Sequence, residues 1–227
     1  MNWLSIFHRP DVSSALKERL NQLPEPVSQG DPKRMRWVVL DLESSGLDMR
    51  NDRILSIGAI AVEQSAVQFD DCHSSLLHAP KFNSKNSVLI HGLTPQQLAL
   101  GKEPSDALVD LLEFIGDSPV VAWQARFDRT LLANELQRHL KTTLRTPFVD
   151  LTQWLALRRP RPQPYEFAEA LALWNITQKQ RHNAFSDAFA TACLLLPLLH
   201  LLEEEARFEQ LLPEVMVNSV RPNTYAL

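Results

Sequence analysis

Hydrophobic residues in the first half of the chain fall into runs that are typical of β-strands. Residues 37–42 form an apolar run, and strands are predicted at 37–43, 54–62 and 66–76. The breaks between these strands are short turns, such as residues 63–65. Strands joined by such short connections pair as antiparallel neighbours, so this part of the chain predicts an antiparallel sheet.

The second half of the chain changes to a helical period. Apolar residues repeat on one face of a first predicted helix, at Ala107, Leu108, Leu111, Leu112 and Ile115. The predicted elements follow in the order helix 104–115, strand 119–123, helix 129–140, strand 147–150, and helices 151–157, 166–173 and 184 to about 211. This alternation indicates parallel pairing through crossover helices. The last helix is expected to bend at Pro197, which cannot donate to the carbonyl of Cys193.

The segment before the first strand differs in composition from the rest. A helix is predicted at 12–23, and the Pro-rich sequence PEPVSQGDPKR at 24–34 is typical of a linker. With 227 residues and 44% hydrophobic content, the chain can bury one substantial core. We therefore expect a helical extension with a linker over 1–35, one domain over 36–212 and a tail over 213–227.

Composition excludes several classes of protein. Two cysteines, Cys72 and Cys193, provide no disulfide framework, which fits a reducing cytoplasm. The N-terminus has no basic leader, and the longest apolar stretch, 188–202, falls short of the roughly 18 residues of a membrane span. We expect a cytoplasmic protein with no membrane partner. The chain has only 6 glycines and no glycine-rich phosphate loop, which speaks against nucleotide binding of the Walker type.

A set of acidic residues and one histidine stands out against this pattern: Asp41, Glu43, Asp128, His182 and Asp187. Two-metal hydrolysis of a phosphodiester needs this combination. Two divalent ions about 4 Å apart clamp the attacking and leaving oxygens, so the protein supplies several carboxylate ligands. Histidine, which ordinarily titrates near neutral pH, can take the proton of the attacking water.

The spacings of these residues agree with a shared site. Asp41 and Glu43 are two residues apart at the end of a strand, so both project from the same face. His182 and Asp187 are five apart, which leaves them about 140° out of line on a continuous helix. We therefore expect Asn183 to be the N-cap, with His182 in the preceding loop and Asp187 in the first turns of the helix.

Four segments together resemble a known family. They are DLESSGLD at 41–48, IHGLT at 90–94, AWQARFD at 122–128 and HNAFSD at 182–187. They resemble the motifs of the DEDDh 3′-to-5′ exonucleases, the group of the proofreading epsilon subunit of DNA polymerase III, over roughly residues 36–202. The resemblance implies an α/β protein of RNase H-like fold, with a mixed five-stranded sheet flanked by helices. It also implies two Mg²⁺ or Mn²⁺ ions and release of 5′-mononucleotides from a 3′ end.

The resemblance also assigns roles to individual residues. The metal ligands would be Asp41, Glu43, Asp128 and Asp187, and the general base would be His182. The residues expected to touch the terminal nucleotide are Ser44, Gly46, Leu47, His91 and Phe127.

One departure from the family pattern lies in the second motif. Trp123 and Gln124 stand where many members have His-Asn, while Phe127 and Asp128 are present. Trp123 either offers a stacking face to a base or closes the end of a core strand. Asp150, which precedes a predicted helix, is expected to cap that helix rather than to take part in chemistry.

The charge balance is compatible with a nucleic-acid substrate. The net charge is −4, but setting aside the four proposed ligands leaves 23 acidic residues against 23 Lys and Arg. Basic residues cluster at 33–36, 158–161 and 179–181, and each cluster is either a phosphate contact or a solvated face.

Two classes of function are compatible with these observations. The first is a metal-dependent 3′-to-5′ exonuclease that acts on single-stranded or frayed 3′ ends of DNA, with RNA 3′ ends as the alternative substrate. The second is a catalytically weak binding module of the same fold, associated with a polymerase or another repair protein. A degenerate member should have lost at least one of the five groups, and none is missing here.

Overall fold

The computed structural model describes residues 12–79, 91–178, 180–202 and 206–217. Its centre is a five-stranded sheet in the order β3-β2-β1-β4-β5. The strands are β1 (Trp37–Ser44), β2 (Ile54–Glu63), β3 (Ala66–Leu76), β4 (Val120–Ala122) and β5 (Phe148–Asp150). β1, β2 and β3 pair antiparallel, whereas β4 joins β1 and β5 in parallel. The predicted mixed sheet is therefore confirmed.

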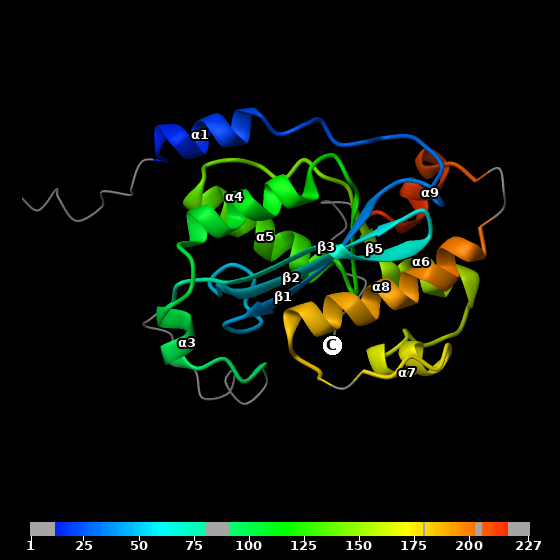
Figure 1. Cartoon of the computed structure of the whole chain (residues 1–227). Coiled ribbons are helices and arrows are strands. Elements are labelled where there is room, and N and C mark those ends of the chain that lie inside the picture. Colours follow the sequence, from blue (N-terminus) through cyan, green and yellow to red (C-terminus); the bar gives the residue numbers. More distant parts are fainter. Residues whose placement is uncertain (1–11, 80–90, 179, 203–205, 218–227) are drawn as a thin grey trace, which may run out of the picture.

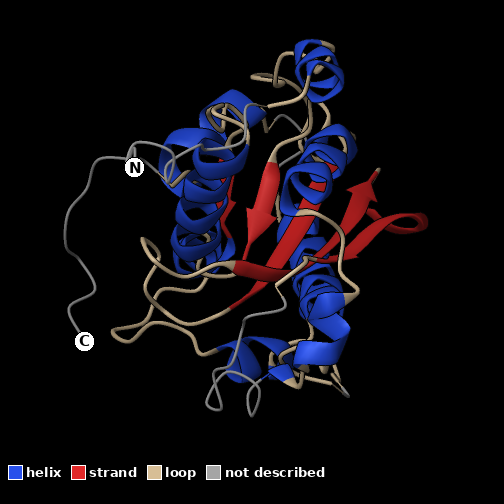
Figure 2. Ribbon diagram, turned by 90° about the vertical axis from the view of Figure 1, so that its left-hand side faces the viewer, coloured by secondary structure: helices blue, strands red, loops and turns tan. Residues whose placement is uncertain are grey.

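Helices cover both faces of this sheet (Figures 1 and 2). One layer contains α4 (Pro104–Ile115) and α5 (Arg126–His139), and the other contains α8 (Ala184–His200) and α6 (Leu151–Arg158). The remaining described helices are α1 (Ser14–Asn21), α3 (Pro95–Ala99), α7 (Phe167–Ala172) and α9 (Phe208–Val215). The apolar face predicted for α4 is buried as expected. None of the helices in the described part of the chain is long and apolar enough to cross a membrane.

The alternation of side chains along β1 decides where its polar end points. Val38 and Leu40 contribute to the core beneath α4 and α5, while Trp37 and Val39 contribute to the core beneath α8. Because side chains alternate along a strand, Asp41 has the same orientation as Val39. The carboxylate therefore lies on the sheet face that α8 covers.

A glycine in β2 allows α8 to approach this part of the sheet. Gly58 pairs with Asp41 across the two strands. A Cβ atom on Gly58 would lie 2.2 Å from the backbone carbon of Ala184 and 2.2 Å from the backbone nitrogen of Phe185. The first turn of α8 thus rests directly on the backbone of β2, which places Asp187 opposite Asp41.

The last helix is shorter than predicted. The sequence indicates one helix from 184 to about 211, but α8 continues through Pro197 and ends at His200, and α9 begins at Phe208. The prediction was wrong because the apolar period runs across the break without a glycine to mark it. The acidic sequence at 203–205 is a better signal, since carboxylates are unfavourable at a helix C-terminus.

The end of the sheet at which β1 begins is joined to segments before β1 and after α8. The indole N–H of Trp37 donates to the carbonyl of Pro32 at 2.8 Å, and the Phe208 N–H donates to the carbonyl of Gly30 at 2.9 Å. After α9, the N–H of Val217 donates to the carbonyl of Phe148 at the sheet edge, at 2.9 Å. Hydrogen bonds thus connect residues before β1 and after α9 to the sheet.

The helix α1 lies over α4. Its Arg19 forms ion pairs with Asp110 at 2.7 Å and with Glu113 at 2.6 Å. Both ion pairs of Arg19 are partly exposed, so their contribution to stability is small.

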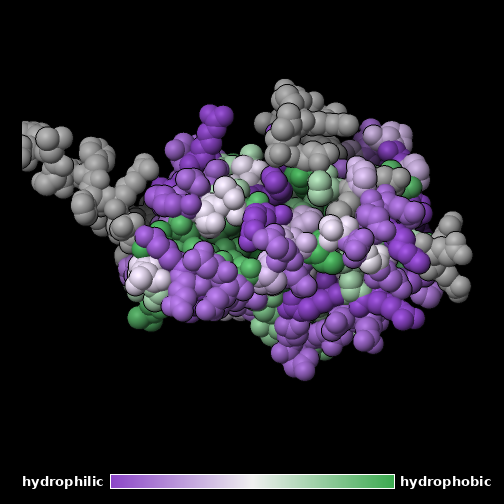
Figure 3. All heavy atoms as spheres, turned by 90° about the horizontal axis from the view of Figure 1, so that it is seen from above, coloured by the Kyte–Doolittle hydropathy of each residue, from purple (hydrophilic) through white to green (hydrophobic). Residues whose placement is uncertain are grey.

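Seen from the side of α1, the surface is mainly hydrophilic, with hydrophobic groups in separate patches (Figure 3).

Candidate active site

Three carboxylates meet where β1 ends and α8 begins. One carboxylate oxygen from each of Asp41, Glu43 and Asp187 lies within 4.8 Å of the others. Asp41 and Glu43 come from alternate positions of β1, and Asp187 comes from the first turn of α8. The structure therefore brings together three of the four predicted metal ligands.

The N-terminus of α8 has the predicted arrangement. Asn183 is the N-cap, and its side chain accepts a hydrogen bond from the Ser186 N–H at 3.0 Å. His182 precedes the cap, is exposed and has a φ of 59°. A left-handed backbone is uncommon for residues other than glycine, and such conformations gather at functional sites. The expectation that His182 and Asp187 do not share a helix is confirmed.

The loop before α8 is attached to Asp187. The backbone N–H of His182 donates to Asp187 Oδ2 at 2.9 Å, and the side-chain amide of Gln178 donates to Asp187 Oδ1. The Ser186 hydroxyl also donates to the carbonyl of Gln180, at 2.7 Å. The same carboxylate that joins the acidic cluster thus holds the loop that carries His182.

Asp128, the fourth predicted ligand, lies in the first turn of α5. The sequence placed the start of this helix at 129, but it begins at Arg126, which puts Asp128 inside the helix. Burial raises the pKa of Asp128, and the backbone N–H groups of Asp128 and Leu42 oppose that rise only in part. The carboxylates of Asp150 and Glu43 raise this pKa further. Asp128 does not contribute an oxygen to this group of three. Its charge nevertheless raises the pKa of Asp41.

The cluster has an excess of negative charge. Burial, and then the charges of Asp128, Asp187 and Glu43, raise the pKa of Asp41 well above its ordinary value. Burial and the charge of Asp187 raise the pKa of Glu43 to about 7. No described residue forms a hydrogen bond or an ion pair with the carboxylates of Asp41 or Glu43. Converging carboxylate oxygens without a cationic partner fit a hard divalent ion such as Mg²⁺ or Mn²⁺.

The loop after β1 presents the residues expected to meet a nucleotide. Leu47 is 88% exposed, and the Ser44 hydroxyl donates to the carbonyl of Gly46 at 2.6 Å. A Cβ atom on Gly46 would lie 2.6 Å from Oδ2 of Asp52, so the loop closes tightly at this glycine. An exposed leucine on a tightly closed loop is compatible with the predicted contact to a terminal nucleotide.

His91 lies in the described segment before α3. Burial lowers the pKa of His91, and the charge of His182 lowers it further. The Leu93 N–H donates to Nδ1 of His91 at 3.1 Å, which fixes that ring nitrogen as an acceptor. The remaining predicted contact, Phe127, is half-buried and packs against the core beneath α4 and α5. Its predicted role at the substrate stays a prediction.

Trp123 directly follows β4 and packs against the same core as Val39, Val121 and the apolar residues of α8. Its ring is half-buried and packs on Phe167 of α7, with centroids 5.3 Å apart. The ring therefore packs against the core, as the structural interpretation predicts, while its stacking on a base stays a prediction.

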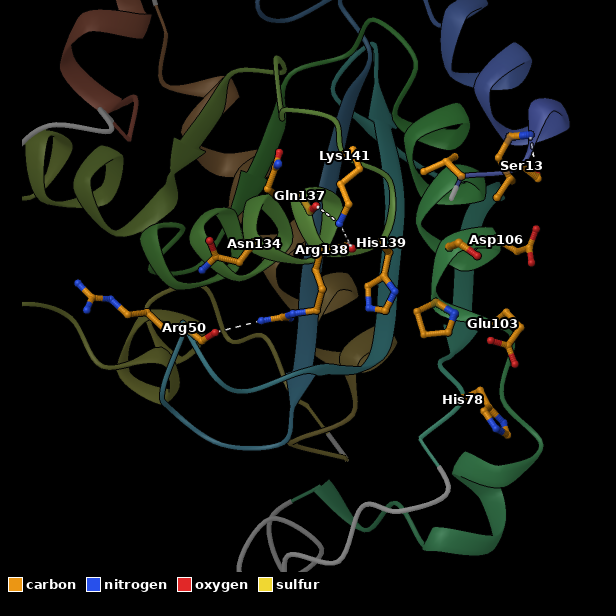
Figure 4. Close-up of a pocket in the computed structure, with 14 residues that line it drawn as sticks. Ser13, Arg50, His78, Glu103, Asp106, Asn134, Gln137, Arg138, His139 and Lys141 are labelled. Carbon is orange, nitrogen blue, oxygen red and sulfur yellow. Dashed lines mark hydrogen bonds between the residues drawn. The ribbon is translucent and has the colours of Figure 1, made fainter. Parts of the chain in front are cut away.

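A cavity of about 1060 Å³ lies elsewhere, between α1, α4 and α5 (Figure 4). Two of the cations that line it, Lys141 and Arg138, bind backbone carbonyls of the protein itself. The ammonium of Lys141 donates to the carbonyls of Gln137 and Arg138, and the guanidinium of Arg138 donates to the carbonyl of Arg50. None of the four acidic residues lines this cavity. Volume alone therefore does not identify the site, and the carboxylate chemistry does.

Sequence reasoning missed two residues that build the cluster. Gly58 admits α8, and its signal is a glycine inside an otherwise apolar strand, which often marks a close backbone approach. Gln178 donates to Asp187, and nothing in its sequence context indicates this contact. The predicted capping role of Asp150 is confirmed, since it accepts from the Thr152 N–H at 2.9 Å.

Comparison with known proteins identifies the family and the fold. The RNase_T family model, described as exonuclease, matches residues 38–195. A PolC-type DNA polymerase III of Thermotoga maritima is 27% identical over 168 residues, which cover 74% of this chain and 12% of the polymerase. The DNA polymerase III subunit epsilon of Aquifex aeolicus is 23% identical over 166 residues, covering 73% of this chain and 81% of the subunit. The chain thus spans a small part of the PolC-type relatives.

The fold also has a counterpart among solved structures. Exonuclease X in complex with 5′ overhanging duplex DNA superposes with a TM-score of 0.58 at 19% sequence identity. The match covers 74% of this chain and 95% of that one. The predicted RNase H-like fold is confirmed.

Proposed function

The chain belongs to the RNase_T exonuclease family, and from that premise we propose that it removes 5′-mononucleotides from the 3′ end of DNA. RNA 3′ ends are the alternative substrate of the same site. The preferred end is single-stranded or frayed, and hydrolysis requires two divalent ions, Mg²⁺ or Mn²⁺. A polymerase or another repair protein is the proposed partner, in line with the names of the relatives.

The observation that carries this proposal is the acidic cluster. Asp41, Glu43 and Asp187 place oxygens within 4.8 Å of one another, and burial together with the charge of Asp187 raises the pKa of both Asp41 and Glu43. Such a group is unfavourable without cations and favourable with them. A protein that used this fold only for binding would have no need of this arrangement.

The proposal gives each residue of the site a role in the reaction. Asp41, Glu43, Asp128 and Asp187 would hold the ions, which when bound would supply charge stabilisation for the reacting phosphodiester. His182, exposed on its loop beside Asp187, accepts the proton of the attacking water. Leu47 and His91 contact the terminal nucleotide and hold its base away from a complementary strand.

The test is a comparison of linear and circular substrates with Mg²⁺. Oligonucleotides labelled at the 5′ end are incubated as single strand, matched duplex, duplex with a mismatched 3′ end and short RNA. A ladder of 5′-labelled products that shortens one nucleotide at a time indicates attack from the 3′ end, and EDTA should stop it. Cleavage of a circular single strand at a similar rate would indicate an endonuclease and contradict the proposal.

A further inference from the structure

Gln178 precedes the loop of His182 and contacts the acidic cluster. Its side-chain amide donates to Oδ1 of Asp187, while the backbone of His182 donates to Oδ2. Both oxygens of this carboxylate therefore have a donor. Asp41 and Glu43, by contrast, have no hydrogen-bond donor among the described residues. Asp187 is thus the carboxylate of the cluster whose orientation the protein fixes directly.

The other half of the same amide lacks a partner. The Oε1 atom of Gln178 is buried and accepts no hydrogen bond from any described residue. Leaving a buried acceptor without a donor destabilises the folded protein, because the atom loses its hydrogen bonds to water. Buried polar atoms are therefore almost always paired with protein or with water. A donor is needed at this position, and it must lie next to the carboxylate that the amide N–H already holds.

We propose that Gln178 is a positioning residue for the cation site. Its N–H groups orient the carboxylate of Asp187, and its Oε1 accepts a hydrogen bond from a water molecule bound to the cation that Asp187 holds. The inference rests on the proposed function in one respect, namely that Asp187 is a cation ligand. A carboxamide suits this role because it offers a donor and an acceptor in one plane.

The role has a measurable consequence for cation affinity. Groups that orient a metal ligand typically change affinity 10–100-fold when they are removed. At saturating cation the ligands themselves are intact, so the maximal rate should fall much less than the affinity. A role limited to folding would instead lower thermal stability and leave the cation affinity of the folded protein unchanged.

The experiment replaces Gln178 without altering the size of the side chain. Gln178→Met keeps the length of the residue and removes the amide, with its hydrogen bonds to Asp187 and Ser186 and the proposed one to water. Binding of Mn²⁺ to the whole chain is measured by titration calorimetry without nucleic acid, and the Mn²⁺ dependence of hydrolysis is measured in parallel. The expected result is a Kd raised about 10–100-fold, with an equal rise in the half-saturating Mn²⁺ concentration.

Two further variants keep the test decisive. Gln180→Met alters an exposed amide in the same loop and should leave the Kd unchanged. Gln178→Asn retains the amide on a shorter side chain and should bind Mn²⁺ with intermediate affinity. If Gln178→Met does not fold, the comparison is made with Gln178→Asn instead.

The outcomes separate this inference from the proposed function. Unchanged Mn²⁺ affinity in a folded Gln178 variant, or a loss of maximal rate alone, would overturn the positioning role while the exonuclease assignment stands. Failure of the unaltered protein both to bind Mn²⁺ and to degrade any 3′ end would remove the proposed function, and this inference with it.

Discussion

The two ends of β1 differ in what they contribute to the molecule. At its start, Trp37 is fully buried, packs against Trp154 and Phe208 with ring centroids 5.9 and 5.2 Å away, and donates its N–H to a carbonyl. At its end, Asp41 and Glu43 have raised pKa values and no compensating donor among the described residues. One strand thus connects a neutral, hydrogen-bonded region with an uncompensated acidic one.

The start of β1 is therefore a source of stability, and its end is a source of activity. Burial of large aromatic rings is a main source of folding free energy. Bringing like charges together opposes folding until cations arrive. Substitutions at the start of β1 should therefore affect stability, and those at its end should affect catalysis.

The largest effect is expected from Asp41→Asn. Loss of a carboxylate ligand should reduce hydrolysis to the background level, because cations are no longer held. Removing one charge also relieves the repulsion on Glu43 and Asp187, so the melting temperature in EDTA should be unchanged or higher. Nuclease assays and thermal melts in EDTA test this pair of outcomes. Full activity of Asp41→Asn with Mg²⁺ would contradict the metal assignment.

The counterpart at the other end of the strand is Trp37→Ala. Removing this ring should lower the free energy of unfolding by about 3–5 kcal/mol. Activity per folded molecule should change little at a temperature where the variant is folded. Urea denaturation and initial rates test the two statements.

Leu47, in the loop that follows the acidic end of β1, provides a matched control for Trp37. Leu47→Ala should alter stability by less than about 0.5 kcal/mol, since Leu47 is 88% exposed. Comparable losses of stability in Trp37→Ala and Leu47→Ala would refute the division between the two ends.

A smaller effect is expected from Gly58→Ala, which tests how the acidic end is assembled. The added Cβ would lie 2.2 Å from the backbone of α8, so the helix must shift and carry Asp187 with it. A displacement of about 1 Å can cost on the order of 10²-fold in rate. Rates with Mg²⁺ measure the loss, and Ser74→Ala, exposed in the strand paired with Gly58, serves as the control. Equal rates for both variants would show that α8 does not depend on this glycine.

The sequence predicts the fold and the members of the site better than it predicts their contacts. The apolar run of β1, the amphipathic period of α4 and the cap at Asn183 are local features, and all three were predicted correctly. The break between α8 and α9 was missed because it interrupts a continuous apolar pattern. The contact of Gln178 with Asp187 depends on how a loop folds back over a helix, and no local pattern encodes that.

The smallest predicted effect is a pH dependence of stability without cations. Burial and like charges raise the pKa of Glu43 from 4.5 to about 7, and they raise the pKa values of Asp41 and Asp128 as well. The folded protein thus binds protons more tightly than the unfolded chain. Stability from these groups is fully present below about pH 4, the ordinary range of carboxylates, and is lost as pH rises through the folded values.

The acidic end alone should produce this dependence, so the melting temperature in EDTA should fall between about pH 4 and 8, by about 2–4 °C for each kcal/mol lost. Asp41→Asn should flatten the decline, because it removes a titrating group whose pKa is raised well above its ordinary value in the folded protein. Trp37→Ala should shift the whole curve downward without changing its slope. Adding Mn²⁺ at pH 8 should restore the melting temperature, since cations bind the ionised carboxylates that repel one another. A decline that persists unchanged in Asp41→Asn would place the titrating groups outside this cluster.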